Sequence, residues 1–300
     1  MKILYSVLVI IALLPGVQSH AQKDASHIRL FIIGNSFSQN ASRYLKQIAE
    51  RGDCQLTIGR AELGGCPLQR HWDSVAVNLL DSLRGKAYNG RSLKELLSNG
   101  KWDIVTIQQY SLLSGDTATY QPYARKLYAF IKELQPDAEV VIHQTWAYRS
   151  DAKNFGKISG NKRAGSQKEM WERSRYAYHK LAGDLGGLRI IPVGDAFYAA
   201  ATDKEWSFVK DNSFDEGNPV QSQLPAEANS LNVGYFWKDG RLQFDPNHAN
   251  EAGCYLAGLV WYGFLFKQNI QKVSFKPGEV SENFAAFLKN TALQTLRSHR

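Results

Sequence analysis

The residue types that could do chemistry lie in two short segments, one near each end of the chain. Near the start, the apolar run 31–33 is followed by Asn35 and Ser36, so a serine stands where a strand would give way to a helix. Near the end, Asp245 comes three residues before His248, just ahead of an apolar segment. A serine hydroxyl, an imidazole and a carboxylate are the nucleophile, general base and orienting acid of acyl transfer.

Taken separately, each segment also has an ordinary structural interpretation. Ser36 could simply cap the helix that follows it, because serine is a common residue at that position. A lone histidine before a helix, such as His248, is usually structural. Asp245 favours chemistry, because from three residues away in a turn its carboxylate can hold one imidazole nitrogen and fix the tautomer. The other nitrogen is then free to take the Ser36 proton.

Together the two segments resemble the first and last sequence blocks of the SGNH/GDSL hydrolase superfamily, and the resemblance covers most of the chain. It implies that Ser36 is the nucleophile and that His248 and Asp245 are its base and orienting acid. It also implies an oxyanion hole formed by the backbone N–H of Ser36 and by that of a glycine after the second strand, Gly65 or Gly64. The Gly-x-Ser-x-Gly turn of ordinary α/β-hydrolases is missing from the sequence.

The chain departs from the superfamily pattern in two places. Asn35 stands where the first block usually has aspartate, and an amide can keep the hydrogen bonds without the charge. After the third strand the superfamily usually has Gly-x-Asn-Asp, with the asparagine in the oxyanion hole, whereas residues 107–111 read Ile-Gln-Gln-Tyr-Ser. A glutamine amide could donate the same hydrogen bond with a longer reach. We therefore expect Gln108, rather than Gln109, to be the third donor.

Other residues near the expected rim are candidates for contact with substrate. We expect Asn35, Gln109 and Trp146 to bind it, because they follow strand ends, although 7 Trp and 14 Tyr make core packing the ordinary role of an aromatic side chain. His143 lies inside an apolar strand, which favours a buried core histidine over a site residue. The spacing of this histidine and the Asp-x-x-His pair does not favour a metal site. The expected chemistry needs no cofactor.

The residues between the two segments predict a parallel sheet. Strands are expected over 28–33, 55–63, 102–108, 138–144 and 188–193, and helices over 38–51, 72–84, 92–99, 120–134 and 168–185. Strands that alternate with helices of this length form right-handed βαβ units. We therefore expect an α/β fold with three layers, a flavodoxin-like doubly wound sheet of five parallel strands in the order 2-1-3-4-5. Ligands bind beyond the carboxyl ends of such strands, so the candidate residues should meet at one rim.

Two segments do not fit this alternation. Residues 149–165 are polar and rich in glycine and lysine, and residues 202–235 form a long stretch with several aromatic side chains. A loop of that length in a compact domain is usually functional, or has been assigned wrongly. Helices expected over 250–266 and 279–296 complete the chain.

The first residues have the composition of a secretory signal peptide. Lys2 precedes an apolar run that ends in small residues, with cleavage expected after Ala21. The run has roughly 12 residues, fewer than the ~20 that span a bilayer. We therefore expect a signal peptide over 1–21 and one SGNH hydrolase-like domain over 22–300, exported to a periplasm or the cell exterior and not inserted in a membrane.

Charge and cysteine content narrow the possible partners. The formal net charge is +8, but lysine and arginine are spread along the chain, which favours a solvated basic surface over a nucleic-acid site. Cys54 and Cys66 flank a strand of about eight residues, at ~3.3 Å each, and so lie too far apart for a disulfide. Cys66 could pair with Cys254, and the alternative is that all three cysteines are free buried thiols.

The sequence thus predicts an exported serine esterase. The expected substrate is a short-chain ester, such as an acetyl ester, on a small molecule or an acylated polysaccharide. A lysophospholipase or thioesterase is the alternative among enzymes. A glycan-binding protein that keeps the fold without turnover is the alternative outside them.

Overall fold

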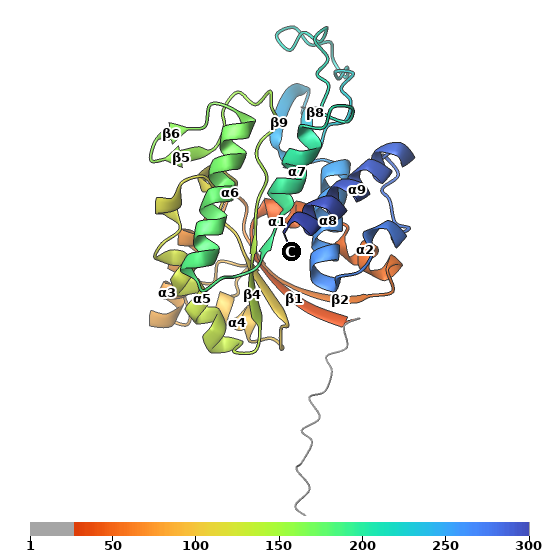
Figure 1. The fold of residues 1–300 in the computed structure, drawn as a ribbon. Helices are drawn as coiled ribbons and strands as arrows, with labels where there is room; N and C mark the ends of the chain where they lie inside the picture. The colour runs from red at the N-terminus through yellow and green to blue at the C-terminus, as the bar shows by residue number, and fades with distance from the viewer. Residues whose placement is uncertain (1–26, 300) are drawn as a thin grey trace, which may run out of the picture.

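The central feature of the computed structural model, which describes residues 27–299, is a parallel sheet of five strands in the order β2-β1-β3-β4-β7 (Figure 1). The strands are β1 (His27–Gly34), β2 (Gln55–Glu62), β3 (Ile104–Ile107), β4 (Glu139–His143) and β7 (Ile190–Ile191). This is the predicted order, and the predicted three-layer α/β fold is confirmed.

Helices cover both faces of the sheet, because its strands are apolar on both sides. Along β1, Leu30 and Ile32 belong to one buried core, and Phe31 and Ile33 belong to the other. The second core is covered by α3 (Leu68–Leu80), α4 (Leu93–Leu97), α5 (Tyr123–Leu134) and α6 (Gln167–Asp184). The first is covered by α1 (Ser36–Ala41), α2 (Leu45–Arg51), α7 (Val193–Ala201), α8 (Glu251–Phe266) and α9 (Glu282–Ser298). Alternation along a strand thus assigns each side chain to one of the two cores.

Three helical predictions needed correction. The helix expected over 38–51 is broken into α1 and α2, where the N–H groups of Arg43 and Leu45 bond to carbonyls three residues back instead of four. The helix expected over 72–84 begins earlier and ends at Leu80. Helix α7 was missed, because it lies between the strand expected over 188–193 and the loop expected over 202–235. Short 3₁₀ turns occur at Ser111–Leu113, Thr117–Thr119 and Ile270–Lys272.

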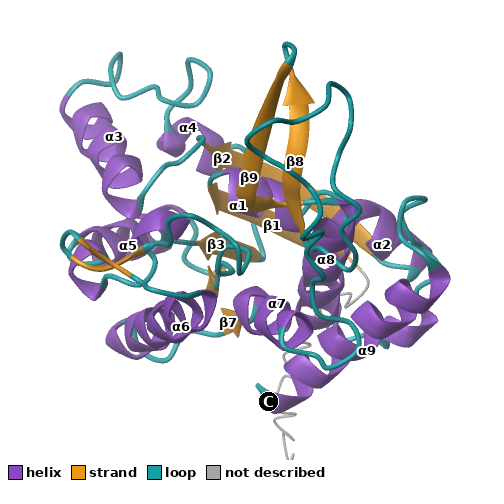
Figure 2. Cartoon of the chain, turned by 90° about the horizontal axis from the view of Figure 1, so that it is seen from above, coloured by secondary structure: helices purple, strands orange, loops and turns teal. Residues whose placement is uncertain are grey.

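An antiparallel hairpin stands outside the sheet and was also missed. It consists of β8 (Asn232–Lys238) and β9 (Arg241–Ala249), and a second small pair is formed by β5 (Lys157–Ser159) and β6 (Lys162–Arg163). Asp239 and Gly240 connect β8 to β9, both with positive φ (49° and 69°), as a type I′ turn requires. The hairpin and the long loop before it project at the top of the molecule, above the carboxyl ends of the strands (Figures 1 and 2).

Three further predictions concern the cysteines, insertion in a membrane and the signal peptide. Cys54, Cys66 and Cys254 are buried free thiols, so the possible Cys66–Cys254 pairing is wrong. Within residues 27–299, no helix combines the length and apolar character that crossing a membrane requires. The predicted signal peptide, 1–21, lies outside the described residues.

Candidate active site

The turn that carries Ser36 is held on all sides by hydrogen bonds. Ser36 is the first residue of α1, and Asn35 caps this helix by accepting from the Phe37 N–H at 3.0 Å. The Asn35 amide donates to the Cys66 carbonyl at 3.0 Å, which links the turn to the loop after β2. A Cβ on Gly34 would lie 2.4 Å from Ser38 Oγ, so a larger residue there would displace this hydroxyl from its hydrogen bonds to Asn35 and Glu62.

Glu62, at the end of β2, strengthens this turn and was missed by the sequence analysis. Its carboxylate accepts from Ser38 Oγ at 2.6 Å and from Arg60 at 3.0 Å. Burial raises the pKa of the Glu62 carboxyl, although Arg60 and Ser38 oppose the shift. No local motif marks Glu62, because its partner Ser38 lies 24 residues away in the sequence.

The structure brings Ser36, His248 and Asp245 together in a continuous hydrogen-bonded row. His248 Nε2 lies 2.9 Å from Ser36 Oγ, and His248 Nδ1 lies 2.7 Å from Asp245 Oδ2. All three side chains are partly exposed. The row has the geometry in which a serine hydroxyl can pass its proton to an imidazole oriented by a carboxylate.

A bulge in the hairpin presents His248. The strand pairs are Gly234 with Asp245 and Asn232 with Ala249, so three residues of β9 stand opposite one residue of β8. Within the bulge, Asp245 Oδ1 accepts the backbone N–H groups of Asn247 and His248, each at 3.0 Å. The predicted turn is therefore an irregular end of a strand, with its carboxylate holding both the backbone and the ring of the histidine.

Electrostatics keep the Asp245 carboxyl ionised. Burial acts to raise its pKa, but the His248 ring and the N–H groups of His248 and Asn247 outweigh burial, so the pKa lies below its usual value. A carboxylate in this position accepts a hydrogen bond from Nδ1–H and stabilises the ring when Nε2 takes up a second proton.

Two of the predicted oxyanion-hole donors are backbone groups that point to no protein acceptor. Among the described residues, neither Ser36 N–H nor Gly65 N–H donates a hydrogen bond to another part of the chain. Gly65 adopts a positive φ of 58°, which favours glycine, and it is partly exposed, whereas Gly64 is exposed. Free N–H groups at the start of a helix and in a tight turn suit an anionic oxygen.

Gln108 does not lie where the third donor was expected. Its Nε2 donates to Asn35 Oδ1 at 2.8 Å, and its Oε1 accepts from His143 Nδ1 at 2.7 Å. The residue is only 1% exposed, so it lies behind the nucleophile turn rather than in a hole open to substrate. The structure thus contradicts Gln108 as the third donor, because its amide already connects Asn35 to His143.

His143 is the buried core histidine that its strand position favoured. Burial lowers its pKa to about 3, so the ring is neutral, and it packs edge-on against Trp261. With Nδ1 donating to Gln108, its Nε2 has no hydrogen-bond partner among the described residues.

The three predicted substrate contacts are also corrected by burial. Asn35, Gln109 and Trp146 are each 0% exposed. The Gln109 amide accepts from the N–H groups of Leu68 and Tyr110 and donates to Thr119. These side chains support the backbone of the site from beneath, where substrate cannot touch them.

Trp146 supports the acid–base side in the same way. Its ring is stacked between those of Phe37 and Phe197, with centroid distances of 4.3 and 4.5 Å. Its Nε1 donates to the Asn247 carbonyl at 2.9 Å, inside the bulge that presents His248. The fully buried indole therefore connects the helix of the nucleophile to the segment of the base.

Arg149 fixes the hairpin from its other side. The guanidinium is 2% exposed and pairs with Asp151 and Glu227 through both carboxylate oxygens of each. The backbone N–H of Arg149 donates to the Pro246 carbonyl at 2.9 Å. A Cβ on Gly234, whose φ is 71°, would lie 2.5 Å from the guanidinium.

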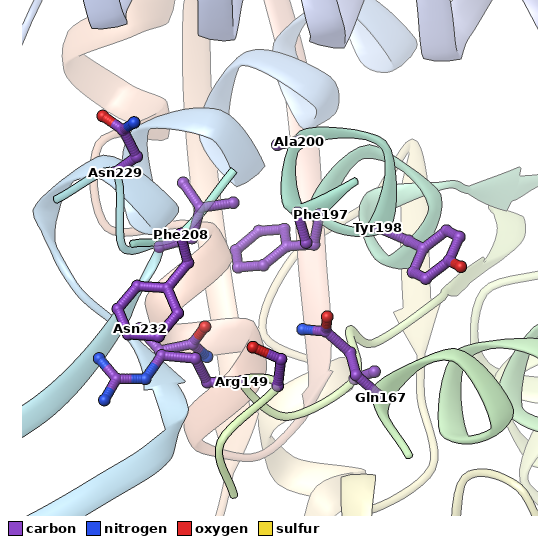
Figure 3. A pocket seen from close by; sticks show the side chains of 12 residues that line it. Arg149, Gln167, Phe197, Tyr198, Ala200, Phe208, Asn229 and Asn232 are labelled. Atoms are coloured by element: carbon purple, nitrogen blue, oxygen red, sulfur yellow. The ribbon is translucent and has the colours of Figure 1, made fainter. Parts of the chain in front are cut away.

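The surroundings of Arg149 show how three segments meet (Figure 3). Its guanidinium carbon lies 4.2 Å from the ring centre of Phe208 and 5.3 Å from that of Phe244, distances typical of cation–π contacts. A cavity of about 40 Å³ separates Arg149 and Phe208 from α7. We call Arg149, Asp151 and Glu227 the arginine clamp, because they join the segment after β4, the long loop and the hairpin.

A group that could hold a metal lies away from the triad. Ligand atoms of His179, Asp195 and His299 lie within 4.8 Å of one another. The Asp195 carboxylate already accepts from Arg175 and Trp171, so a cation there would compete with a guanidinium.

Comparisons with known proteins match the chain to a family of unknown function. The sequence model of a family described as "Domain of unknown function (DUF4886)" matches residues 29–219. No curated protein matches the chain. A solved DUF4886 family protein from Bacteroides uniformis ATCC 8492 has 23% sequence identity and a TM-score of 0.68, covering 90% of this chain and 95% of that one. Phospholipase A1 from Streptomyces albidoflavus NA297 has 13% identity and a TM-score of 0.40, covering 78% and 97%.

Proposed function

We propose that this chain, which belongs to the DUF4886 family, is a serine hydrolase that cleaves ester bonds through Ser36, His248 and Asp245. The observation that carries the proposal is the continuous row from Ser36 Oγ to His248 at 2.9 Å and on to Asp245 at 2.7 Å. Two elements far apart in the sequence, α1 and β9, supply its ends. A serine that only caps a helix needs no hydrogen bond to a histidine, so the row favours a catalytic role for Ser36.

The reaction follows from the position of each group. Ser36 Oγ attacks the ester carbonyl carbon, its proton passes to His248 Nε2, and the carbonyl π electrons move onto the oxygen. When this intermediate collapses, the bond to the leaving oxygen breaks and that oxygen takes the proton from His248. Water then repeats the sequence on the acyl-enzyme, which releases the acid and restores Ser36.

The backbone of the site supplies the electrostatic part of catalysis. The unpaired N–H groups of Ser36 and Gly65 would donate to the oxyanion, and each such donor is worth ~10²–10³ in rate. These two N–H groups are positioned before substrate binds, because Asn35 is hydrogen-bonded both to the nucleophile turn and to the Cys66 carbonyl.

We further propose that the substrate is a short-chain ester, such as an acetyl ester, with a hydrophilic leaving group such as a saccharide. Support comes from the exposed polar side chains of Arg241 and Gln243 on the strand that carries Asp245, and from the exposed Gly64. We also propose export, on the composition of residues 1–21. Fractionation of the producing cells, with the mass of the mature N-terminus, tests export directly.

The proposed activity is tested with p-nitrophenyl esters of increasing acyl length. Wild type should hydrolyse the acetyl ester fastest, Ser36→Ala should lose essentially all turnover, and Ser82→Ala, which removes an exposed hydroxyl elsewhere, should behave as wild type. A fluorophosphonate probe should label wild type and not Ser36→Ala. A preference for long acyl chains or thioesters would redirect the substrate proposal. Equal inertness of wild type and Ser36→Ala, with binding of acylated glycan by both, would favour the binding protein.

A further inference from the structure

The oxyanion hole described above has two candidate backbone donors, and the side-chain donor predicted for it is not available. Gln108, the side chain expected there, is turned inward and held by Asn35 and His143. The side chains of Asn35 and Gln109 are buried and fully bonded as well. If a side chain completes the hole, it must therefore be a different, partly exposed donor beside Gly65.

Tyr110 meets this description. It follows Gln109 at the carboxyl end of β3 and is partly exposed. Its ring lies against Gly65, where a Cβ added to the glycine would be 3.7 Å from Tyr110 Cζ and 3.8 Å from its hydroxyl oxygen. Among the described residues, the Tyr110 hydroxyl has no hydrogen-bond partner. An unpaired donor thus lies beside one of the two backbone donors.

The backbone around Tyr110 is fixed from behind. Its N–H donates to Gln109 Oε1 at 2.9 Å, and the same oxygen accepts from Leu68 N–H at the start of α3. Its carbonyl accepts from Leu113 N–H at 2.8 Å, in the 3₁₀ turn that follows. Gln109 therefore has a positioning role, since it ties the loop after β3 to the helix that follows the Gly65 loop.

A second aromatic residue places Tyr110 on the same side of the molecule as the triad. Tyr148 is buried, and its hydroxyl lies 3.2 Å from Ser111 Oγ, one residue after Tyr110. Burial raises the pKa of Tyr148 to about 12, and the nearby Tyr110 and Asp245 raise it as well. Tyr148 thus contacts the residue after Tyr110, and its neighbour Arg149 donates its backbone N–H to the Pro246 carbonyl, next to Asp245, at 2.9 Å.

We propose that the Tyr110 hydroxyl is the side-chain donor of the oxyanion hole. The inference rests on the proposed esterase function. During attack by Ser36, the oxyanion would accept hydrogen bonds from the N–H groups of Ser36 and Gly65 and from the Tyr110 O–H. Tyr110 keeps its proton throughout, because the proton of the nucleophile goes to His248 and from there to the leaving oxygen. A phenol is a suitable donor for this purpose, and no cofactor or second proton carrier is needed.

The test compares Tyr110→Phe with wild type on p-nitrophenyl acetate. Phenylalanine keeps the ring against Gly65 and removes only the hydroxyl, so kcat should fall about 10²–10³-fold while KM changes little. Affinity for a trifluoromethyl ketone, whose adduct with Ser36 carries an oxyanion, should fall by a similar factor. Tyr128→Phe should leave both values unchanged, because Tyr128 is a partly exposed residue of α5 whose hydroxyl has no hydrogen-bond partner within residues 27–299.

The outcomes separate the two proposals. If wild type hydrolyses the ester, Ser36→Ala does not, and Tyr110→Phe stays within about threefold of wild type in kcat and in ketone affinity, Tyr110 is not the donor. If wild type and Ser36→Ala are equally inert, the esterase function itself fails before Tyr110 is tested. A thermal melt of each variant distinguishes a loss of the hydroxyl from a loss of folding. Should Tyr110→Phe not fold, Tyr110→His, which keeps a ring and a donor, should retain more of kcat than Tyr110→Leu.

Discussion

The two halves of the candidate site are positioned in different ways. The nucleophile half, from Ser36 to Gly65, sits directly on the parallel sheet. It is fixed mainly by the neutral, fully buried side chains of Asn35 and Gln108, with the Glu62 carboxylate bonded to Ser38 as the one charged contribution described above. The acid–base half, with Asp245 and His248, sits on an antiparallel hairpin outside the sheet. That half is fixed by the Trp146 indole, which donates to the Asn247 carbonyl, and by Arg149 of the arginine clamp, whose backbone N–H donates to the Pro246 carbonyl. The nucleophile is thus positioned by the buried core, whereas the base is positioned by a hairpin outside the central sheet.

This difference predicts which substitutions should destabilise the site most. Neutral hydrogen bonds such as that of Asn35 contribute about 1 kcal/mol each, and their loss is felt through the groups left unpaired. A buried ion pair adds little net stability, but removing one partner costs about 3–5 kcal/mol because a charge is left unpaired. The hairpin should therefore depend on few residues, and the nucleophile turn on many.

The largest effect should come from the acid–base half. Asp245→Asn keeps the size of the side chain but allows the amide to meet His248 Nδ1 with the wrong tautomer, so kcat should fall by about 10⁴. Ester hydrolysis at neutral pH measures this loss, and a thermal melt within about 2 °C of wild type would show that the hairpin remains folded. A fall of less than tenfold would mean that Asp245 does not orient the base.

Removing the arginine clamp should be next in size. Arg149→Met leaves the carboxylates of Asp151 and Glu227 unpaired at 12% and 11% exposure, and should cost about 3–5 kcal/mol in urea denaturation together with much of kcat. Arg189→Met is the matched control, because its ion pair with Glu139 is half exposed and should be worth at most about 1 kcal/mol. Equal losses in the two variants would contradict a special role for the clamp.

A smaller effect is expected in the nucleophile half. Asn35→Asp replaces the amide that donates to the Cys66 carbonyl with an oxygen that repels it, and should cost about 1–3 kcal/mol at neutral pH. Because the buried carboxyl should resist ionisation, its pKa should be raised and the loss should shrink as pH falls. Urea denaturation of wild type and variant at pH 7 and at pH 5 measures the loss of stability at each pH. Asn99→Asp, at an exposed position, should show neither effect.

The pH dependence of stability should also distinguish the halves. Burial lowers the pKa of His71 to about 4, against the opposing contribution of the Gly34 carbonyl, and lowers that of His143 to about 3. Both histidines pack behind the nucleophile half. Below about pH 6.5 both histidines become protonated in the unfolded chain but stay neutral in the folded one. The free energy of unfolding should therefore fall by about 1.4 kcal/mol per pH unit for each histidine.

Urea denaturation between pH 7 and pH 5 measures this slope. His143→Gln should reduce it by about half, whereas His27→Gln, in an exposed histidine, should leave it unchanged. An unchanged slope in His143→Gln would mean that the buried ring does not control acid stability.

The sequence predicted what depends on short patterns. Apolar runs and their spacing predicted the five strands and their order, and residue types near Ser36 and His248 predicted the row that the structure assembles. The prediction of Gln108 as the third oxyanion donor was wrong, because the direction of its amide depends on Asn35 and His143, which lie 73 and 35 residues away in the sequence. The clamp could not be predicted either, since Arg149 and Glu227 are 78 residues apart. The hairpin had a signal, Asp239-Gly240 between aromatic segments, that could have been used.

The bulge at the base of the hairpin has a consequence for changes in chain length. Between Asp245 and Ala249, deleting one residue would turn His248 toward the opposite side of the strand, so this stretch should accept no insertion or deletion. The tip at Asp239 and Gly240 lies beyond the five consecutive pairings that run from Gly234–Asp245 to Lys238–Arg241. Homologous chains can therefore differ in the length of this hairpin, and so in what they admit to the rim, while the spacing from aspartate to histidine stays constant.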